Sequence, residues 1–193
     1  MDMAGESYII LGKKRLGAPA ARNRMKPTLF EIMRILDLKP LPEEGGFFAE
    51  SYRSSETIDA RELKKGHSGP RPLCTGIYYM LTPTSFSALH KLPGDEMFHF
   101  YAGDPVEMLE LFPNGSAQTV TLGSDITGGM KLQHVVPGGV WQGSRLLKGG
   151  DYALLGTTMA PGFDYQDFAK GQAEELLAKY PQHAARIREL VRS

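Results

Sequence analysis

Residues 87–103 read SALHKLPGDEMFHFYAG, and this stretch decides the fold. The pattern predicts a strand that ends at His90, a tight turn at Pro93-Gly94-Asp95 and a second strand that begins at Glu96. Two strands joined by such a turn run antiparallel, so an imidazole and a carboxylate come together on one wall. The stretch therefore predicts two strands joined by a tight turn and marks them as the place where chemistry could occur.

Runs rich in β-branched and aromatic residues continue on both sides of these two strands. Gly, Pro, Asn or Asp residues separate the runs. They predict about eight strands, with residues 163–168 as a candidate ninth. The predicted strands cover residues 74–81, 84–92, 96–102, 106–112, 117–122, 131–136, 139–147 and 151–158. No helical pattern interrupts them, so we expect antiparallel pairing and a mainly β fold, a jelly-roll sandwich or barrel.

Short helices are expected at both ends of this β region. Thr28-Leu29-Phe30-Glu31 is a capping box that begins an amphipathic segment. Residues 173–180 and 184–191 show two further short helical patterns, and residues 47–53 an extended one. Residues 1–24 have no sustained period and are expected to be a flexible extension, which leaves residues 25–193 as a single domain.

Charge and composition exclude several classes of function. The 193 residues carry 22 Lys and Arg against 22 Asp and Glu, so there is no basic footprint for nucleic acid. No apolar run is long enough to cross a membrane. One Cys allows no internal disulfide, which favours a reducing, cytoplasmic location. A small molecule is the partner that remains.

Three of the five histidines are set aside as candidates. His67 lies in the polar stretch 54–72 and is expected to be a surface residue. His183 precedes the last helix and is also expected to be exposed. His134 lies within a predicted strand with no other polar residue recurring at its spacing. His90 and His99 therefore remain.

The spacing of His90, Glu96 and Gly103 resembles the first signature of the cupin superfamily. In that signature a His-x-His pair is followed by Glu and then Gly. Here Leu92 takes the place of the second His, and Gln142 takes the place of the His in the second signature. The resemblance implies a double-stranded β-helix, and it implies that two of the usual four metal-ligand positions are replaced.

Longer stretches are similar to one branch of this superfamily, a family of unknown function grouped with the RmlC-like jelly rolls. The matching stretches are residues 41–54, 95–105, 122–125, 135–143 and 160–168. The resemblance runs from about residue 27 to the C-terminus and omits the N-terminal extension. It implies a homodimer of small single-domain cupins, each with a pocket inside the barrel.

One hypothesis for the pocket is a divalent transition metal held by His90, Glu96, His99 and Gln142. Imidazole nitrogen with carboxylate and amide oxygen suits Fe, Mn, Ni or Zn. Glu96 and His99 are three residues apart, however, and strict alternation along a strand would point them to opposite faces unless a bulge intervenes.

A second hypothesis needs no metal and makes the protein an isomerase or epimerase of a sugar-like substrate. His90 would act as general base, Tyr101 or Tyr79 as acid, and Glu96 would orient the imidazole or bind a substrate hydroxyl.

A third hypothesis is a non-catalytic pocket that binds a sugar-like or carboxylate metabolite. The residues expected to contact the ligand are Glu50, Arg53, His99, Trp141 and Gln142. Within this set Arg53 would act as an anion clamp, and Trp141 would line the mouth of the pocket.

Overall fold

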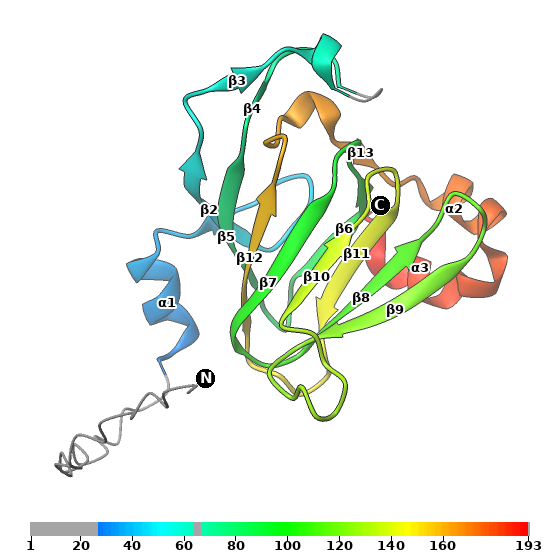
Figure 1. Ribbon diagram of the computed structural model, residues 1–193. Coiled ribbons are helices and arrows are strands. Elements are labelled where there is room, and N and C mark those ends of the chain that lie inside the picture. Colours follow the sequence, from blue (N-terminus) through cyan, green and yellow to red (C-terminus); the bar gives the residue numbers. More distant parts are fainter. Residues whose placement is uncertain (1–26, 64–66, 193) are drawn as a thin grey trace, which may run out of the picture.

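The computed structural model describes residues 27–63 and 67–192 (Figure 1). The N-terminal extension predicted over residues 1–24 lies outside the described residues. Among those that are described, no helix is long and apolar enough to cross a membrane.

Two antiparallel sheets pack face to face and form a jelly-roll sandwich, which confirms the predicted fold class (Figure 1). Neighbouring strands are mostly far apart in sequence, as a jelly roll requires. The six-stranded sheet runs β1 (Lys39–Pro40), β2 (Phe47–Arg53), β5 (Thr75–Leu81), β12 (Ala153–Met159), β7 (Glu96–Gly103) and β10 (Gln133–Val136). The five-stranded sheet runs β13 (Ala169–Lys170), β6 (Phe86–Lys91), β11 (Trp141–Leu146), β8 (Val106–Leu111) and β9 (Ala117–Leu122).

The main hydrophobic core lies between the two sheets. It is built from the inward-facing residues of both, because alternate side chains of a strand point to opposite faces. Phe98 and Phe100 of β7 enter it from one sheet, and Met108 of β8 and Leu122 of β9 enter it from the other. This core fills the sandwich and leaves one end for the cavity described below.

Helices cover parts of the outer faces. α1 (Leu29–Ile35) begins at the predicted capping box, where the Thr28 hydroxyl accepts a hydrogen bond from the Glu31 amide. Its buried Ile32 belongs to a cluster with Met80 on the outer side of the six-stranded sheet. α2 (Ala173–Lys179) and α3 (Ala184–Leu190) pack against the outer side of the five-stranded sheet, so the predicted terminal helices are confirmed.

Residues 162–171, which we call the strap, cross one end of the sandwich from one sheet to the other (Figure 1). The Gly162 amide donates to the Pro72 carbonyl oxygen at 2.7 Å, and the Phe163 amide donates to the Thr75 hydroxyl at 2.9 Å. At the other end the Gly171 amide donates to the Leu89 carbonyl oxygen at 2.7 Å. The candidate ninth strand over 163–168 is therefore wrong, because a short 3-10 helix occupies 165–167 and the strand that follows is β13.

The polar stretch 54–72 is more ordered than the sequence suggests, since it contains the small sheet of β3 (Thr57–Ile58) and β4 (Arg71–Pro72). Its end is fastened to the strap by Asp167, which accepts hydrogen bonds from Arg71 at 2.6 and 2.8 Å. His67 Nδ1 lies 2.9 Å from the same carboxylate, and only 5% of the His67 side chain is exposed. The prediction that His67 is a surface residue is wrong, because a buried carboxylate binds it.

Candidate functional site

A cavity opens beneath the strap, against the inner face of the six-stranded sheet. Its volume is about 90 Å3. Strands β2, β5, β7 and β12 supply one side, the loop between β1 and β2 supplies another, and the strap closes over it. The lining residues that matter for its chemistry are Glu43, Glu44, Glu50, Arg53, Glu96, Phe163, Tyr165 and Phe168.

Beneath the lining residues Glu44, Glu96 and Phe168, His90 is buried between two carboxylates. Its Nε2 is 4.0 Å from Glu44 Oε2 and 4.0 Å from Glu96 Oε2. The other ring nitrogen, Nδ1, is 2.8 Å from the carbonyl oxygen of Ala88. Since a carbonyl oxygen only accepts, Nδ1 carries a proton and donates it to Ala88. This hydrogen bond fixes the ring so that Nε2 faces both carboxylates.

The charge of His90 follows from these neighbours. Burial by itself would lower the pKa of its imidazole, but the negative charges of Glu44 and Glu96 outweigh burial and raise the pKa to about 9. At neutral pH the ring is then an imidazolium, which has no lone pair left to accept a proton. The geometry fits a general acid rather than the general base that the sequence predicts.

Glu44 is a site residue that the sequence motifs do not indicate. Its carboxylate accepts a hydrogen bond from the Ser87 hydroxyl at 2.7 Å, and its backbone carbonyl accepts one from the Ala88 amide at 2.8 Å. Gly45 follows with a φ of 104°, a conformation that favours glycine and turns the chain into β2. Burial, with help from the charge of Glu96, raises the pKa of Glu44.

Gln142 contacts the site from behind Glu96. Its Nε2 donates to Glu96 Oε2 at 2.7 Å. A carboxylate only accepts hydrogen bonds, so the amide must present nitrogen to it, and Oε1 is left buried without a partner. The expected role of Gln142 as an oxygen ligand of a metal does not fit this orientation.

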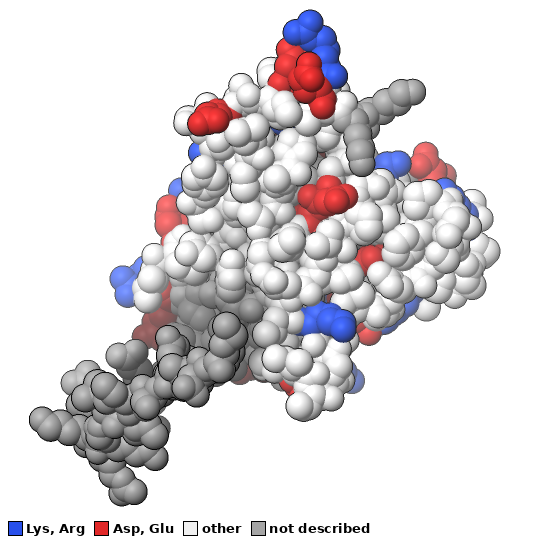
Figure 2. Space-filling model, in the orientation of Figure 1, with Lys and Arg blue, Asp and Glu red and all other residues white. Residues whose placement is uncertain are grey.

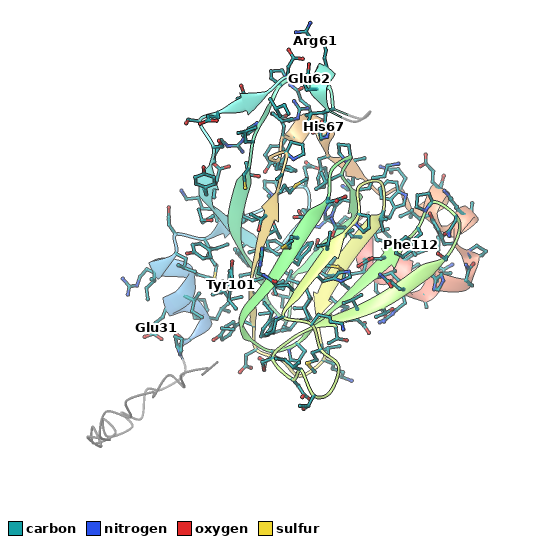
Figure 3. The ribbon with its side chains drawn as sticks, in the orientation of Figure 1. Glu31, Arg61, Glu62, His67, Tyr101 and Phe112 are labelled. Atoms are coloured by element: carbon teal, nitrogen blue, oxygen red, sulfur yellow. The ribbon has the colours of Figure 1, made fainter. Side chains whose placement is uncertain are left out.

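His99 and Tyr101, which the sequence places in the pocket, lie on the outer face of the six-stranded sheet. His99 contacts the Thr158 hydroxyl at 2.5 Å and Gln133 Nε2 at 3.0 Å. Tyr101, which Figure 3 labels, is 52% exposed, and its ring stacks on that of His99. The reason is the strand period: Glu96, Phe98 and Phe100 point inward, so the residues between them point outward.

The predicted metal site is not assembled by these residues. His99 lies outside, and Gln142 meets Glu96 through its nitrogen, so His90 and Glu96 are the two members of the predicted set that come together with atoms able to bind a metal. Within residues 27–63 and 67–192 no group of three His, Cys, Asp or Glu side chains has a spacing that could hold a metal ion. We therefore derive no chemical step through a metal.

Glu50 and Arg53 do line the cavity, but their side chains form an ion pair with each other. The Arg53 Nε and Nη2 atoms donate to the Glu50 carboxylate at distances of 2.7–3.1 Å, and Nη1 donates to the Phe163 carbonyl oxygen at 3.2 Å. The guanidinium charge is thus neutralised within the protein, which weakens the hypothesis of an anion clamp.

Two other aromatic candidates do not line the cavity, although Tyr79 lies beside Glu44. Trp141 packs with the cluster that holds α2 and α3, and the Lys91 ammonium lies 4.6 Å from its ring centroid. Tyr79 is buried and donates its hydroxyl hydrogen bond to the Gly45 carbonyl oxygen at 2.8 Å. Burial raises its pKa well above the ordinary value of 10.0, so its hydroxyl is held as a structural donor.

Three of the four aromatic residues that line the cavity come from the strap, and the fourth is Phe48 of β2. The ring of Phe168 stacks on His90 with centroids 5.1 Å apart and an angle of 20° between the planes. Phe163 and Tyr165 make an edge-to-face pair at 5.0 Å. Their only sequence signal was their place in the matching stretch 160–168.

His134 forms a second cluster of titratable groups, outside the cavity. It contacts the carboxylate of Glu110, a fully buried residue, and Gln118 Nε2 donates to the same carboxylate at 2.9 Å. Glu110 is the direct cross-strand partner of Gln142. A polar row therefore continues from the floor of the cavity across the inner face of the five-stranded sheet.

A jelly-roll sandwich with a cluster of ionisable side chains in a cavity at one end is typical of the cupin class of proteins. The chain belongs to the cupin superfamily family DUF985, whose model matches residues 30–170. This confirms the family that the sequence motifs resemble.

Relatives agree with this assignment. The chain is 32% identical to the uncharacterized protein YML079W of Saccharomyces cerevisiae over 155 residues, which cover 75% of this chain and 77% of that protein. A hypothetical protein from Leishmania major has a TM-score of 0.78 at 32% identity, covering 86% of this chain and 100% of that one. A protein from Shewanella oneidensis has a TM-score of 0.74 at 35% identity, covering 86% and 99%.

Proposed function

We propose that this cupin is an acid–base isomerase or epimerase of a small, hydroxyl-bearing carbonyl compound. The observation that carries the proposal is the position of His90 Nε2, beneath the cavity lining, between the lining carboxylates of Glu44 and Glu96. Catalytic acids and bases need pKa values near the working pH, and burial together with close charges moves both His90 and Glu44 in that direction or past it.

Glu44 is the better base of the two carboxylates. A carboxylate whose pKa is raised by burial is a stronger proton acceptor than an ordinary one. Glu96 is engaged by the amide of Gln142, whereas Glu44 is held by the hydroxyl of Ser87 and lies at the end of a loop beside the cavity. Glu96 then serves to keep His90 charged and correctly oriented.

In the reaction Glu44 removes a proton from a carbon next to the substrate carbonyl. The electron pair of that C–H bond moves into the new C=C bond, and the carbonyl oxygen takes the proton of His90 Nε2. The result is an enediol, neutral Glu44 and neutral His90. Return of the proton to the neighbouring carbon, with His90 recharged from the enediol hydroxyl, completes an isomerisation. An epimerisation requires the proton to return to the opposite face of the same carbon.

A non-catalytic sugar-binding pocket is the second candidate. It is favoured by the combination of carboxylates with the aromatic residues Phe163, Tyr165 and Phe168, because carboxylates accept hydrogen bonds from hydroxyl groups and aromatic faces pack on sugar rings. Both functions use the same residues, and they differ in whether a C–H bond is broken.

Solvent exchange separates the two functions. A panel of aldoses and ketoses is incubated with the protein in deuterium oxide and followed by proton NMR. We expect loss of the signal of the hydrogen next to the carbonyl for at least one sugar, and we expect Glu44→Gln and His90→Gln to stop it. Glu62→Gln, an exposed change at the tip of the loop labelled in Figure 3, is the matched control. Binding by calorimetry without exchange would contradict catalysis and leave the binding function.

A further inference from the structure

The charges that line the cavity are strongly unbalanced. Four carboxylates, those of Glu43, Glu44, Glu50 and Glu96, share the lining with a single guanidinium, that of Arg53. Beneath them the imidazolium of His90 balances one carboxylate. Among the described residues of the lining, carboxylates therefore outnumber the cations.

The one cation in the lining is not free for a ligand. Arg53 uses two of its nitrogen atoms on Glu50, and the third donates to Phe163 of the strap. An anionic ligand would have to displace Glu50 to gain a bidentate contact. It would also approach Glu44 and Glu96 in a partly dry cavity, where repulsion between like charges is strong.

The remaining wall suits a positive charge. Phe163, Tyr165 and Phe168 present aromatic rings to the cavity, and the negative faces of such rings attract organic cations. Glu43 lies at the exposed rim and Glu44 lies deeper, so a ligand that enters passes from one carboxylate to the next.

We infer that the cavity selects its ligand by charge. It takes a hydroxyl-bearing compound that carries a protonated amine in preference to the neutral compound, and it rejects the same skeleton when it carries a carboxylate. The inference rests on the proposed function for the location of the site, and it adds the class of substrate, an amino sugar or a similar amino polyol.

Three sugars with the same ring test the inference, because they differ in charge: glucosamine, glucose and glucuronate. Their dissociation constants are measured by NMR titration of the untagged full-length protein at neutral pH and low salt. We expect glucosamine to bind about tenfold more tightly than glucose, and glucose to bind more tightly than glucuronate. Added salt should narrow these differences.

Two variants test the cause. Glu50→Gln releases Arg53 from its partner and removes one carboxylate, so it should improve glucuronate binding several-fold and weaken glucosamine binding. Glu43→Gln should weaken glucosamine binding by a larger factor than it weakens glucose binding. Glu62→Gln, far from the cavity, removes the same charge and should change none of the three constants.

Equal affinities for the three sugars would overturn charge selection, and so would tightest binding of glucuronate. Binding of none of them would overturn the proposed ligand class. The proton-exchange experiment above is independent of these outcomes, since exchange into a different carbonyl compound would still support the isomerase while this inference failed.

Discussion

The two faces of strand β7 lie in different surroundings. The inward face presents Glu96, Phe98 and Phe100 to the cavity and the core, and all three are buried. The outward face presents Met97 and Tyr101, which are 38% and 52% exposed. Six consecutive residues of one motif therefore serve two separate surfaces. A sequence motif alone does not show which of its residues share a face. The alternation of side chains along a strand does show it.

The largest expected difference between the faces is in stability. Phe98→Ala leaves a cavity in the core between the sheets and should lower the free energy of unfolding by about 3–5 kcal/mol. Tyr101→Ala removes a half-exposed ring and should cost about 1 kcal/mol or less. Urea denaturation of both variants measures the difference. Similar losses would mean that the outer ring is covered in the folded protein.

The second expected difference is in the pH dependence of stability, and it compares His90 with His99. The pKa of His90 is raised from 6.5 to about 9 in the folded state. Its stabilisation is therefore fully present below pH 6.5 and is lost as the pH rises through about 9. The full effect is at most roughly 3 kcal/mol. Urea denaturation between pH 6 and pH 9.5 should show this decline in the wild type.

The matched variants sharpen this second test. His90→Gln should remove most of the decline, whereas His99→Gln should leave it in place, because His99 lies on the outer face of the sheet. A decline that survives in His90→Gln would show that other groups cause it.

The third expected difference is in assembly. The homodimer implied by the resemblance remains a prediction. The outer face of the six-stranded sheet presents few charges in Figure 2 and exposes Tyr52, Met97, Tyr101 and Val135. If a second copy covers this face, Met97→Glu should raise the dissociation constant of the dimer at least tenfold, about 1.4 kcal/mol. Light scattering over a dilution series measures it. Glu62→Gln is the control, and a wild-type mass of one chain at all concentrations would contradict the dimer.

The smallest expected effect concerns the hydrogen bonds of the outer face. Thr158→Val removes the hydroxyl that contacts His99 and should lower the free energy of unfolding by about 1 kcal/mol. Thr157, its neighbour, lines the cavity instead. Thr157→Val should therefore leave stability nearly unchanged. A larger loss in Thr157→Val than in Thr158→Val would reverse the assignment of the two faces of β12.

Local patterns were enough to predict the strands, because alternation and turn residues are written in short stretches such as 106–112 and 117–122. The motif also identified His90 and Glu96, which lie on opposite sheets close to the turn that joins them. Glu44 could not be found in this way. It reaches His90 because the loop after β1 folds onto β6, a contact between residues more than forty positions apart.

The aromatic wall was missed for a related reason. Phe168 stacks on His90 only because β13 pairs with β6 and places Lys170 opposite His90. A two-residue strand carries no periodic signal, so its partner cannot be inferred from the residues themselves. The aromatic side of the cavity therefore depends on long-range pairing of short segments, whereas the positions of His90 and Glu96 follow from the pattern of the main strands.

The attachment of the strap by Asp167, Arg71 and His67 has a consequence for how related sequences can diverge. Removal of one member of a buried ion pair typically costs about 3–5 kcal/mol, whereas replacement of both members by apolar residues is often neutral. Substitution of Asp167 alone leaves the Arg71 charge buried, so it is selected against unless Arg71 changes as well. We expect positions 71 and 167 to covary among relatives, retained together or lost together, although 96 residues separate them in the chain.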